Sequence, residues 1–119
     1  MPVLELPCVM VSGSPRELGR AHGEALRDLI RGFVDQRMRA ARVYLREHHL
    51  RDENRLVELG AACLAELAVW DPEGHAEHIG VAAAAGVDAA ELYAAGNMTD
   101  LRDILTFPGV RADQEGCSE

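Results

Sequence analysis

The residue of this chain best suited to covalent chemistry is Cys117, which follows a glycine in the closing stretch RADQEGCSE. A cysteine in a polar, glycine-preceded segment differs from core cysteines, which are usually buried and inert. Composition alone favours an incidental thiol in a frayed end, because chain ends concentrate such segments. A nucleophilic role for Cys117 therefore needs support from the rest of the chain.

The histidines are the other candidates for chemistry. His75 and His78 stand three residues apart in a predicted helix, where two imidazoles share one face and could hold a metal ion. A third ligand at fixed spacing is missing, so a solvated or capping role is favoured, and we expect neither metal nor cofactor. His48 and His49 fit a helix end, where a cation complements the dipole. His22 lies on an apolar helical stripe, where a histidine is usually a satisfied core residue.

The remaining cysteines and the first ten residues indicate the cellular location that we expect for the protein. Cys8 and Cys63 fit packing positions, and three widely spaced cysteines do not form a disulfide framework. The start MPVLELPCVM lacks the basic region of a signal peptide. No apolar run approaches the roughly 20 residues of a spanning helix. We therefore expect a cytoplasmic protein that binds no membrane.

Apolar residues recur at helical spacing along most of the chain, so we expect helices to position the candidate cysteines and histidines. Ser14, Pro15 and Glu17 form a strong helix start with a capping box. Apolar residues then recur at helical spacing, which predicts one long helix at about 15–48. The further predicted helices span about 53–69, 72–85 and 89–95.

Two segments are expected to form strands. Residues 3–11 are β-branched and apolar with partial alternation, and Pro7 indicates an edge position. Residues 104–107 fit a second short strand, after which a polar tail spans 108–119. An isolated pair of strands is marginal by itself. We therefore expect an α+β chain, mainly helical, whose one or two strands join a sheet supplied by another chain.

Composition limits the size and the partners of the protein. The chain has 119 residues, of which 48% are hydrophobic and only 4% aromatic, enough for one small domain rich in helix. The formal net charge is −8, and all 12 basic residues are arginine. A net acidic domain lacks the electrostatic footprint of a nucleic-acid binder. No nucleic-acid partner is expected.

Three segments, taken in order, resemble the acyl-coenzyme A:isopenicillin N acyltransferase family. GSPRELGRAHGEALRDLI (13–30) is similar to the opening motif of that family. VWDPEGHAEHIGVAAAAGVDAAELYAAGNMTDLRD (69–103) resembles its middle, and EGCS (115–118) resembles the junction at which those precursors cut themselves. The positions that carry the opening motif are Gly13, Glu17, Gly19, His22 and Gly23.

The resemblance implies an N-terminal-nucleophile hydrolase. Such a precursor cleaves its own backbone before a cysteine and leaves a small α-subunit, here residues 1–119, bound to a larger β-subunit in an αββα sandwich. The implied activity is acyl transfer or amide hydrolysis, in which an acyl group passes from a small-molecule donor through a thioester to an amine or water. The implied processing junction comprises Gly116, Cys117, Ser118 and Glu119. The residues implied as structural or pocket support are His22, Asn97 and Asp100.

Two readings of the nucleophile stay open. Cys117 is the nucleophile if the backbone is cut before it. Alternatively, the cut follows Glu119 and the next residue is the nucleophile, because Glu119 stands where the family usually places an apolar residue. A different class of function also fits, namely a free-standing helical interaction module in which Cys117 is incidental. The amphipathic pattern of residues 15–48 and the acidic surface support that module.

Overall fold

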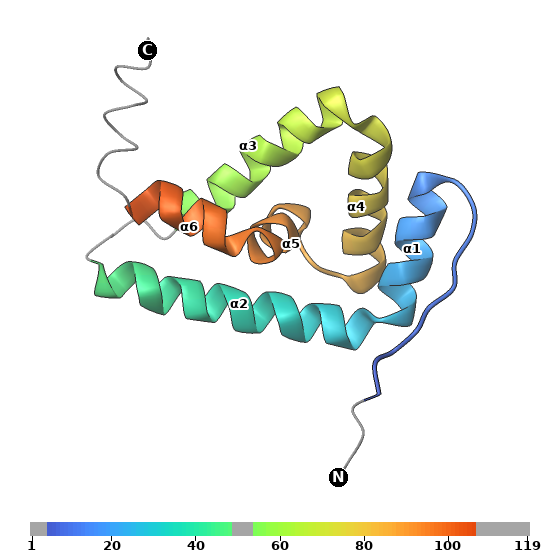
Figure 1. Cartoon of the computed structure of the whole chain (residues 1–119), viewed down its shortest axis with the longest axis horizontal. Coiled ribbons are helices and arrows are strands. Elements are labelled where there is room, and N and C mark those ends of the chain that lie inside the picture. The colour runs from blue at the N-terminus through green and yellow to red at the C-terminus, as the bar shows by residue number, and fades with distance from the viewer. Residues whose placement is uncertain (1–4, 49–53, 107–119) are drawn as a thin grey trace.

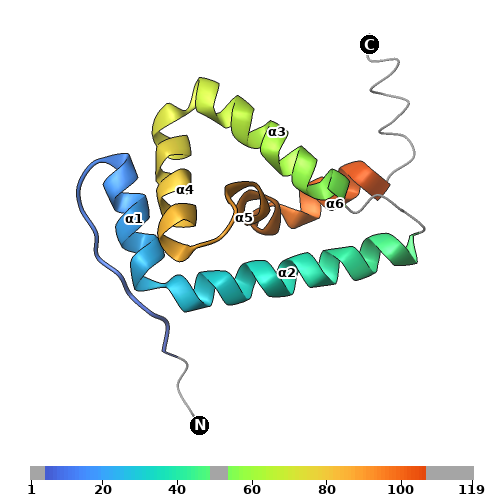
Figure 2. The same ribbon diagram turned by 180° about the vertical axis from the view of Figure 1, so that it is seen from behind.

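The computed structural model describes residues 5–48 and 54–106, and within these ranges the chain forms six α-helices. Figure 1 shows α2 along one side, with α3 and α4 forming an angle opposite to it and α5 between them. Helix α1 lies beside α4, and the reverse view in Figure 2 shows the same neighbours. The helices are α1 (Pro15–Ala25), α2 (Arg27–Glu47), α3 (Asn54–Trp70), α4 (Pro72–Ala85), α5 (Ala89–Gly96) and α6 (Met98–Thr106).

The predicted α+β fold, with strands joining an αββα sandwich, is wrong, because the described residues contain no strand. Residues 5–11 have no regular secondary structure and are exposed, because no described segment pairs with their backbone groups. Residues 104–106 belong to α6 instead, since Leu101, Ile104 and Leu105 recur at helical spacing. The outer parts of both expected strands, residues 3–4 and 107, lie outside the described residues.

The single helix expected at 15–48 divides at Leu26 into α1 and α2. Leu26 has φ −117° and ψ 27°, which takes its backbone out of the helix. Its N–H still donates to the carbonyl of His22 at 3.1 Å. The break turns α1 onto α4 and away from the axis of α2 (Figure 1). The other expected ranges differ from α3, α4 and α5 by no more than one residue at either end.

Capping residues set where three of the helices begin. The side chains of Ser14, Asp71 and Asp88 each accept a hydrogen bond from the backbone N–H three residues later. These contacts satisfy amide groups that have no partner inside the helix. Gly86 ends α4 with a φ of 73°, a conformation that glycine adopts without strain. The sequence signals for these ends therefore correspond to observed contacts.

The main core lies between α2, α3, α5 and α6. Leu45 and Leu56 are its largest fully buried side chains. Burial of apolar surface here stabilises the packing of the long helix α2 on α5 and α6. The buried members are Val34, Met38, Ala41, Leu45, Leu56, Ala94, Ala95, Met98 and Leu101.

Replacement of Leu56 by alanine tests this core. Leu56 is 0% exposed, so we expect the free energy of unfolding to fall by about 2–5 kcal/mol, as for other buried leucines. Chemical denaturation followed by circular dichroism measures this loss. The matched control is Leu6→Ala, since Leu6 is 79% exposed and its truncation leaves no cavity. Equal losses in both variants would contradict the assignment of the core.

Helices α1 and α4 pack through glycine. A Cβ atom on Gly80 would lie 2.6 Å from the carbonyl oxygen of Arg16, and one on Gly23 would lie 2.5 Å from that of Val81. A Cβ on Gly19 would overlap the carbonyl oxygen of Glu77. The two backbones therefore touch, and only glycine allows this approach.

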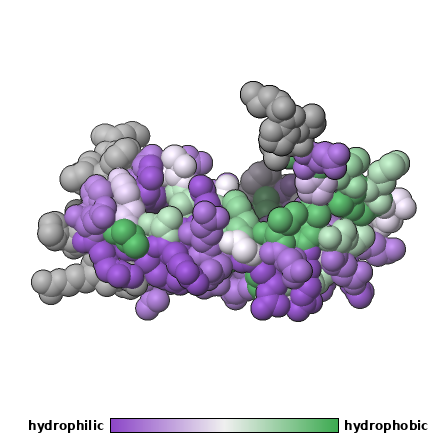
Figure 3. All heavy atoms as spheres, turned by 90° about the horizontal axis from the view of Figure 1, so that it is seen from below, coloured by the Kyte–Doolittle hydropathy of each residue, from purple (hydrophilic) through white to green (hydrophobic). Residues whose placement is uncertain are grey.

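Hydrophobic side chains are unevenly distributed over the described surface. Seen from below, they gather on one half of the molecule, and the other half is mainly hydrophilic (Figure 3). Leu6 and Met10 in the N-terminal segment, and Val69 and Trp70 at the end of α3, are among the large exposed apolar side chains. Clustered apolar surface is typical of contact sites.

No single helix among the described residues is long and apolar enough to cross a membrane. Helices α4 and α5 reach the required length and composition only when they are joined across a bend of 110°.

Candidate functional site

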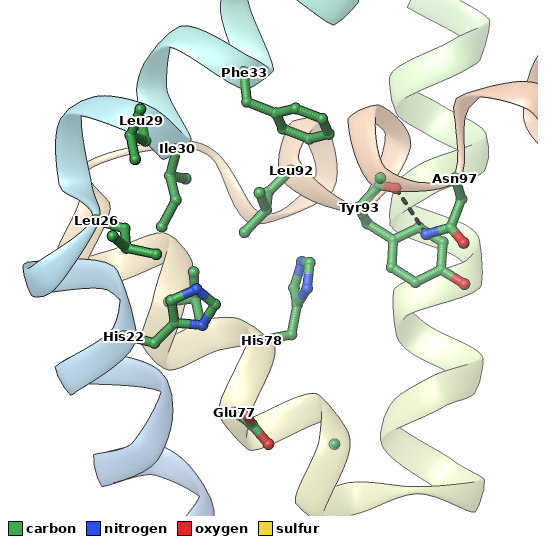
Figure 4. A pocket seen from close by; sticks show the side chains of 13 residues that line it. His22, Leu26, Leu29, Ile30, Phe33, Glu77, His78, Leu92, Tyr93 and Asn97 are labelled. Atoms are coloured by element: carbon green, nitrogen blue, oxygen red, sulfur yellow. Dashed lines mark hydrogen bonds between the residues drawn. The ribbon is translucent and has the colours of Figure 1, made fainter. Parts of the chain in front are cut away.

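A groove of about 560 Å³ lies between α1, α2, α4 and α5. This volume falls within the roughly 300–1,000 Å³ of small-molecule sites. Figure 4 shows polar side chains around the same open space as a set of apolar ones. The apolar walls include Leu26, Leu29, Ile30, Phe33, Val81 and Leu92. The polar side chains are those of His22, Glu77, His78, Tyr93 and Asn97.

His78 is held in one orientation within the groove. It lies in the middle of α4, and its Nε2 is 2.9 Å from the carbonyl oxygen of Ala89 at the start of α5. A carbonyl oxygen only accepts, so Nε2 carries the proton and donates. The ring also meets Tyr93 edge-on, with centroids 5.8 Å apart at 68°. In the neutral imidazole, Nδ1 is therefore left as an acceptor.

Asn97 lies where α5 ends, at the opposite side of the groove from His22 (Figure 4). Its Nδ2 donates to the carbonyl oxygen of Tyr93 at 3.0 Å, and its backbone N–H donates to the same oxygen at 3.0 Å. These bonds satisfy a carbonyl that has no partner inside the helix. The amide oxygen of Asn97 remains as an acceptor.

His22 is the side chain of the opening motif that faces the groove. Glu17 accepts a 2.8 Å hydrogen bond from the Ser14 hydroxyl, and Gly19 and Gly23 allow α1 to touch α4. His22 lies in the last turn of α1, is exposed, and its imidazole faces the groove. The expectation of a satisfied core histidine is wrong, because the break after α1 leaves this face uncovered.

The structure brings two of the three predicted support residues together. His22 and Asn97 line the same groove, although α1 and α5 are far apart in the sequence. Asp100 is exposed on α6 and does not line the groove. The predicted nucleophile and junction lie outside the described residues; they are Gly116, Cys117, Ser118 and Glu119.

The metal hypothesis for His75 and His78 gains no third ligand from the fold. In the part of the chain that the structure describes, no group of three or more His, Cys, Asp or Glu residues could hold an ion. The Nε2 atom of His78 already donates to Ala89. His48 follows α2, as expected of a helix end, with Nδ1 2.9 Å from the carbonyl oxygen of Tyr44; His49 lies outside the described residues.

Sequence reasoning did not identify most of the groove. Phe33 and Leu29 extend the apolar stripe of α2, which indicates core positions, yet they are 43% and 61% exposed. Tyr93 and Leu92 fall on a short alanine-rich helix without a chemical pattern. Exposed aromatic and leucine side chains become recognisable as a binding wall only when α1, α2 and α5 are assembled.

The groove contains groups for binding and proton transfer. Imidazole and carboxylate groups can exchange protons with a bound molecule. No serine, threonine or cysteine among the described residues lines the groove, so a thiol or aliphatic hydroxyl nucleophile there has to come from elsewhere.

Comparison with known proteins gives no relative from which a function can be transferred. The chain matches no family model, no curated protein and no solved structure.

Proposed function

We propose that this chain is the small α-subunit of a self-processing acyltransferase or amidase of the N-terminal-nucleophile class. It acts only with a β-subunit cut from the same precursor. The nucleophile is Cys117 or the residue that follows Glu119. The cysteine thiolate attacks the acyl carbon of a small-molecule amide or thioester, and the amine or thiol of that donor leaves with a proton. The acyl group then passes from sulfur to an amine or to water and the thiol is regenerated, with no cofactor.

One observation supports this proposal above the others. The two upstream segments that carry the family resemblance pack directly on each other, with Gly19 and Gly23 of the first against the helix that holds Gly80 of the second. The same two segments supply His22 and Asn97 to one groove. The two segments therefore form one packed unit.

The proposed chemistry follows from the properties of an N-terminal cysteine. A free thiol has a pKa of about 8.5 and is a good nucleophile only when a base removes its proton. Self-cleavage exposes the α-amine of the cysteine, whose reference pKa of about 8 suits it to take that proton. Gly116 precedes Cys117 and gives the backbone the freedom that an N-to-S acyl shift requires.

A thiol nucleophile requires a reducing environment, which the cytoplasm maintains. Both cysteines in the described part of the chain, Cys8 and Cys63, are free. We therefore propose a cytoplasmic location.

Intact mass spectrometry of the complete gene product tests the proposal. We expect two polypeptides that copurify, because an α-subunit of this class stays bound to its partner after cleavage. The smaller polypeptide should end at Gly116 or at Glu119. A single uncut polypeptide that hydrolyses no amide or thioester would overturn the proposal.

A second function, a helical interaction module without catalysis, is favoured by one observation. Hydrophobic side chains gather on one half of the face shown in Figure 3, and clustered apolar surface is typical of sites that contact a partner. The same mass measurement separates the two functions, since an interaction module stays uncut.

A further inference from the structure

Three groups of the groove are free to accept a hydrogen bond, while the His22 imidazole and the Tyr93 hydroxyl can donate as well as accept. The carboxylate of Glu77 only accepts when it is ionised. His78 uses its N–H on Ala89, so Nδ1 of the neutral ring accepts. Asn97 uses its amide nitrogen on Tyr93, so its amide oxygen accepts. A ligand that donates hydrogen bonds is therefore complementary to this set.

The charge around the groove also favours a cation. None of the described arginines lines it. Arg37 lies against the Phe33 ring, 5.8 Å from its centroid, but its Nε donates to the carbonyl oxygen of Ala95. The chain as a whole carries a formal charge of −8, which raises the local concentration of cations. An anionic ligand would meet the Glu77 carboxylate without a compensating positive side chain among the groove residues.

The rest of the groove fits an apolar body. Ile30 and Leu92 face the open space with Phe33, which is 43% exposed (Figure 4). A ligand that covers these side chains removes apolar surface from water.

We propose that the groove binds a small-molecule primary amine with an apolar body. The ammonium group pairs with the Glu77 carboxylate, and the body lies against α2 and Leu92. The proposed function includes an amine as acyl acceptor, but binding at this site does not depend on self-cleavage, because the groove residues alone form the site.

Three probes with one apolar body and different heads test this assignment. The probes are 4-phenylbutylamine, 4-phenylbutanol and 4-phenylbutyrate, titrated by calorimetry into the complete gene product. We expect the amine to bind at least about tenfold more tightly than the carboxylate, with the alcohol between them, because charge-assisted hydrogen bonds favour the ammonium group. Equal or tighter binding of the carboxylate would overturn the assignment, as would the absence of amine binding.

Two variants locate the binding. Glu77→Gln should weaken amine binding about tenfold and leave the alcohol unchanged, because it removes only a charge. The matched control is Glu73→Gln, which changes an exposed glutamate of the same helix that does not line the groove. Phe33→Ala should weaken all three probes alike. Amine affinity that neither Glu77→Gln nor Phe33→Ala alters would place the ligand elsewhere and overturn the assignment.

These results are separable from the proposed function. Self-cleavage is read by intact mass, whereas binding of the amine is read by calorimetry. An uncut gene product that binds the amine in the groove leaves this assignment intact and overturns only the proposed function.

Discussion

Replacement of Gly19 by alanine is expected to lower the free energy of unfolding by about 3 kcal/mol or more. The new Cβ would overlap the carbonyl oxygen of Glu77 and lie 3.0 Å from the backbone nitrogen of Val81. These are backbone atoms of a packed helix, so they cannot move aside as the end of a flexible side chain can. Relief of the overlap requires α1 to move away from α4. Because both helices line the groove, this movement also changes its shape.

Gly32→Ala is the matched control for this prediction. Gly32 lies in α2, and an added Cβ would meet nothing within 4 Å. Alanine favours the helix by up to about 1 kcal/mol over glycine, so this variant should be more stable than the parent. Urea denaturation followed by circular dichroism measures both variants. A Gly19→Ala protein as stable as the Gly32→Ala protein would show that α1 and α4 do not touch through their backbones.

The sequence predicted helix starts well because their signals are local. Ser14 and Pro15 at one start, and Asp71 and Pro72 at another, act on groups within one turn of themselves. The break at Leu26 has no such signal. Neither glycine nor proline stands there, and the apolar stripe runs through it without a shift. The break follows from the packing of α1 on α4, which is a long-range contact.

The strand expected at residues 3–11 was predicted wrongly because a strand depends on a partner segment. β-Branched and apolar residues favour an extended backbone, and residues 5–11 do lack a helix. A strand, however, is defined by hydrogen bonds to a neighbour, which the pattern of one segment does not contain. Without a pairing segment among the described residues, the apolar side chains of Leu6 and Met10 remain exposed.

The groove was only partly predictable from the sequence, because it depends on contacts between segments that are far apart in the chain. His22 was distinguishable because it stands on an apolar stripe within a motif, and Asn97 because it belongs to a segment that carries the family resemblance. Their position on one groove depends on how α1, α4 and α5 assemble. His78 was considered only with His75, as a metal ligand, whereas its contact with Ala89 makes it a fixed acceptor in the groove.

The largest expected functional effect is that of Cys117→Ala in the complete gene product. If Cys117 is the nucleophile, alanine removes the sulfur that attacks the carbonyl of Gly116 and later holds the acyl group. Self-cleavage should stop, and amide or thioester hydrolysis should fall at least about 1,000-fold. Intact mass spectrometry and an acyl-release assay measure the two effects. Cys8→Ala is the matched control, because Cys8 is exposed and has no proposed role in the reaction, so this variant should cut normally.

Cys117→Ser distinguishes loss of chemistry from loss of folding. A serine hydroxyl keeps the shape of the side chain and is a weaker nucleophile than a thiolate, so we expect slow cleavage at the same bond. Cleavage of Cys117→Ala at the parental rate would contradict this assignment. The mass of the small polypeptide then identifies the nucleophile, because a chain that ends at Glu119 retains Ser118 and shows that the following residue makes the cut. The two candidate bonds, after Gly116 and after Glu119, are three residues apart. The length of the small polypeptide therefore shows which side chain carries the acyl group.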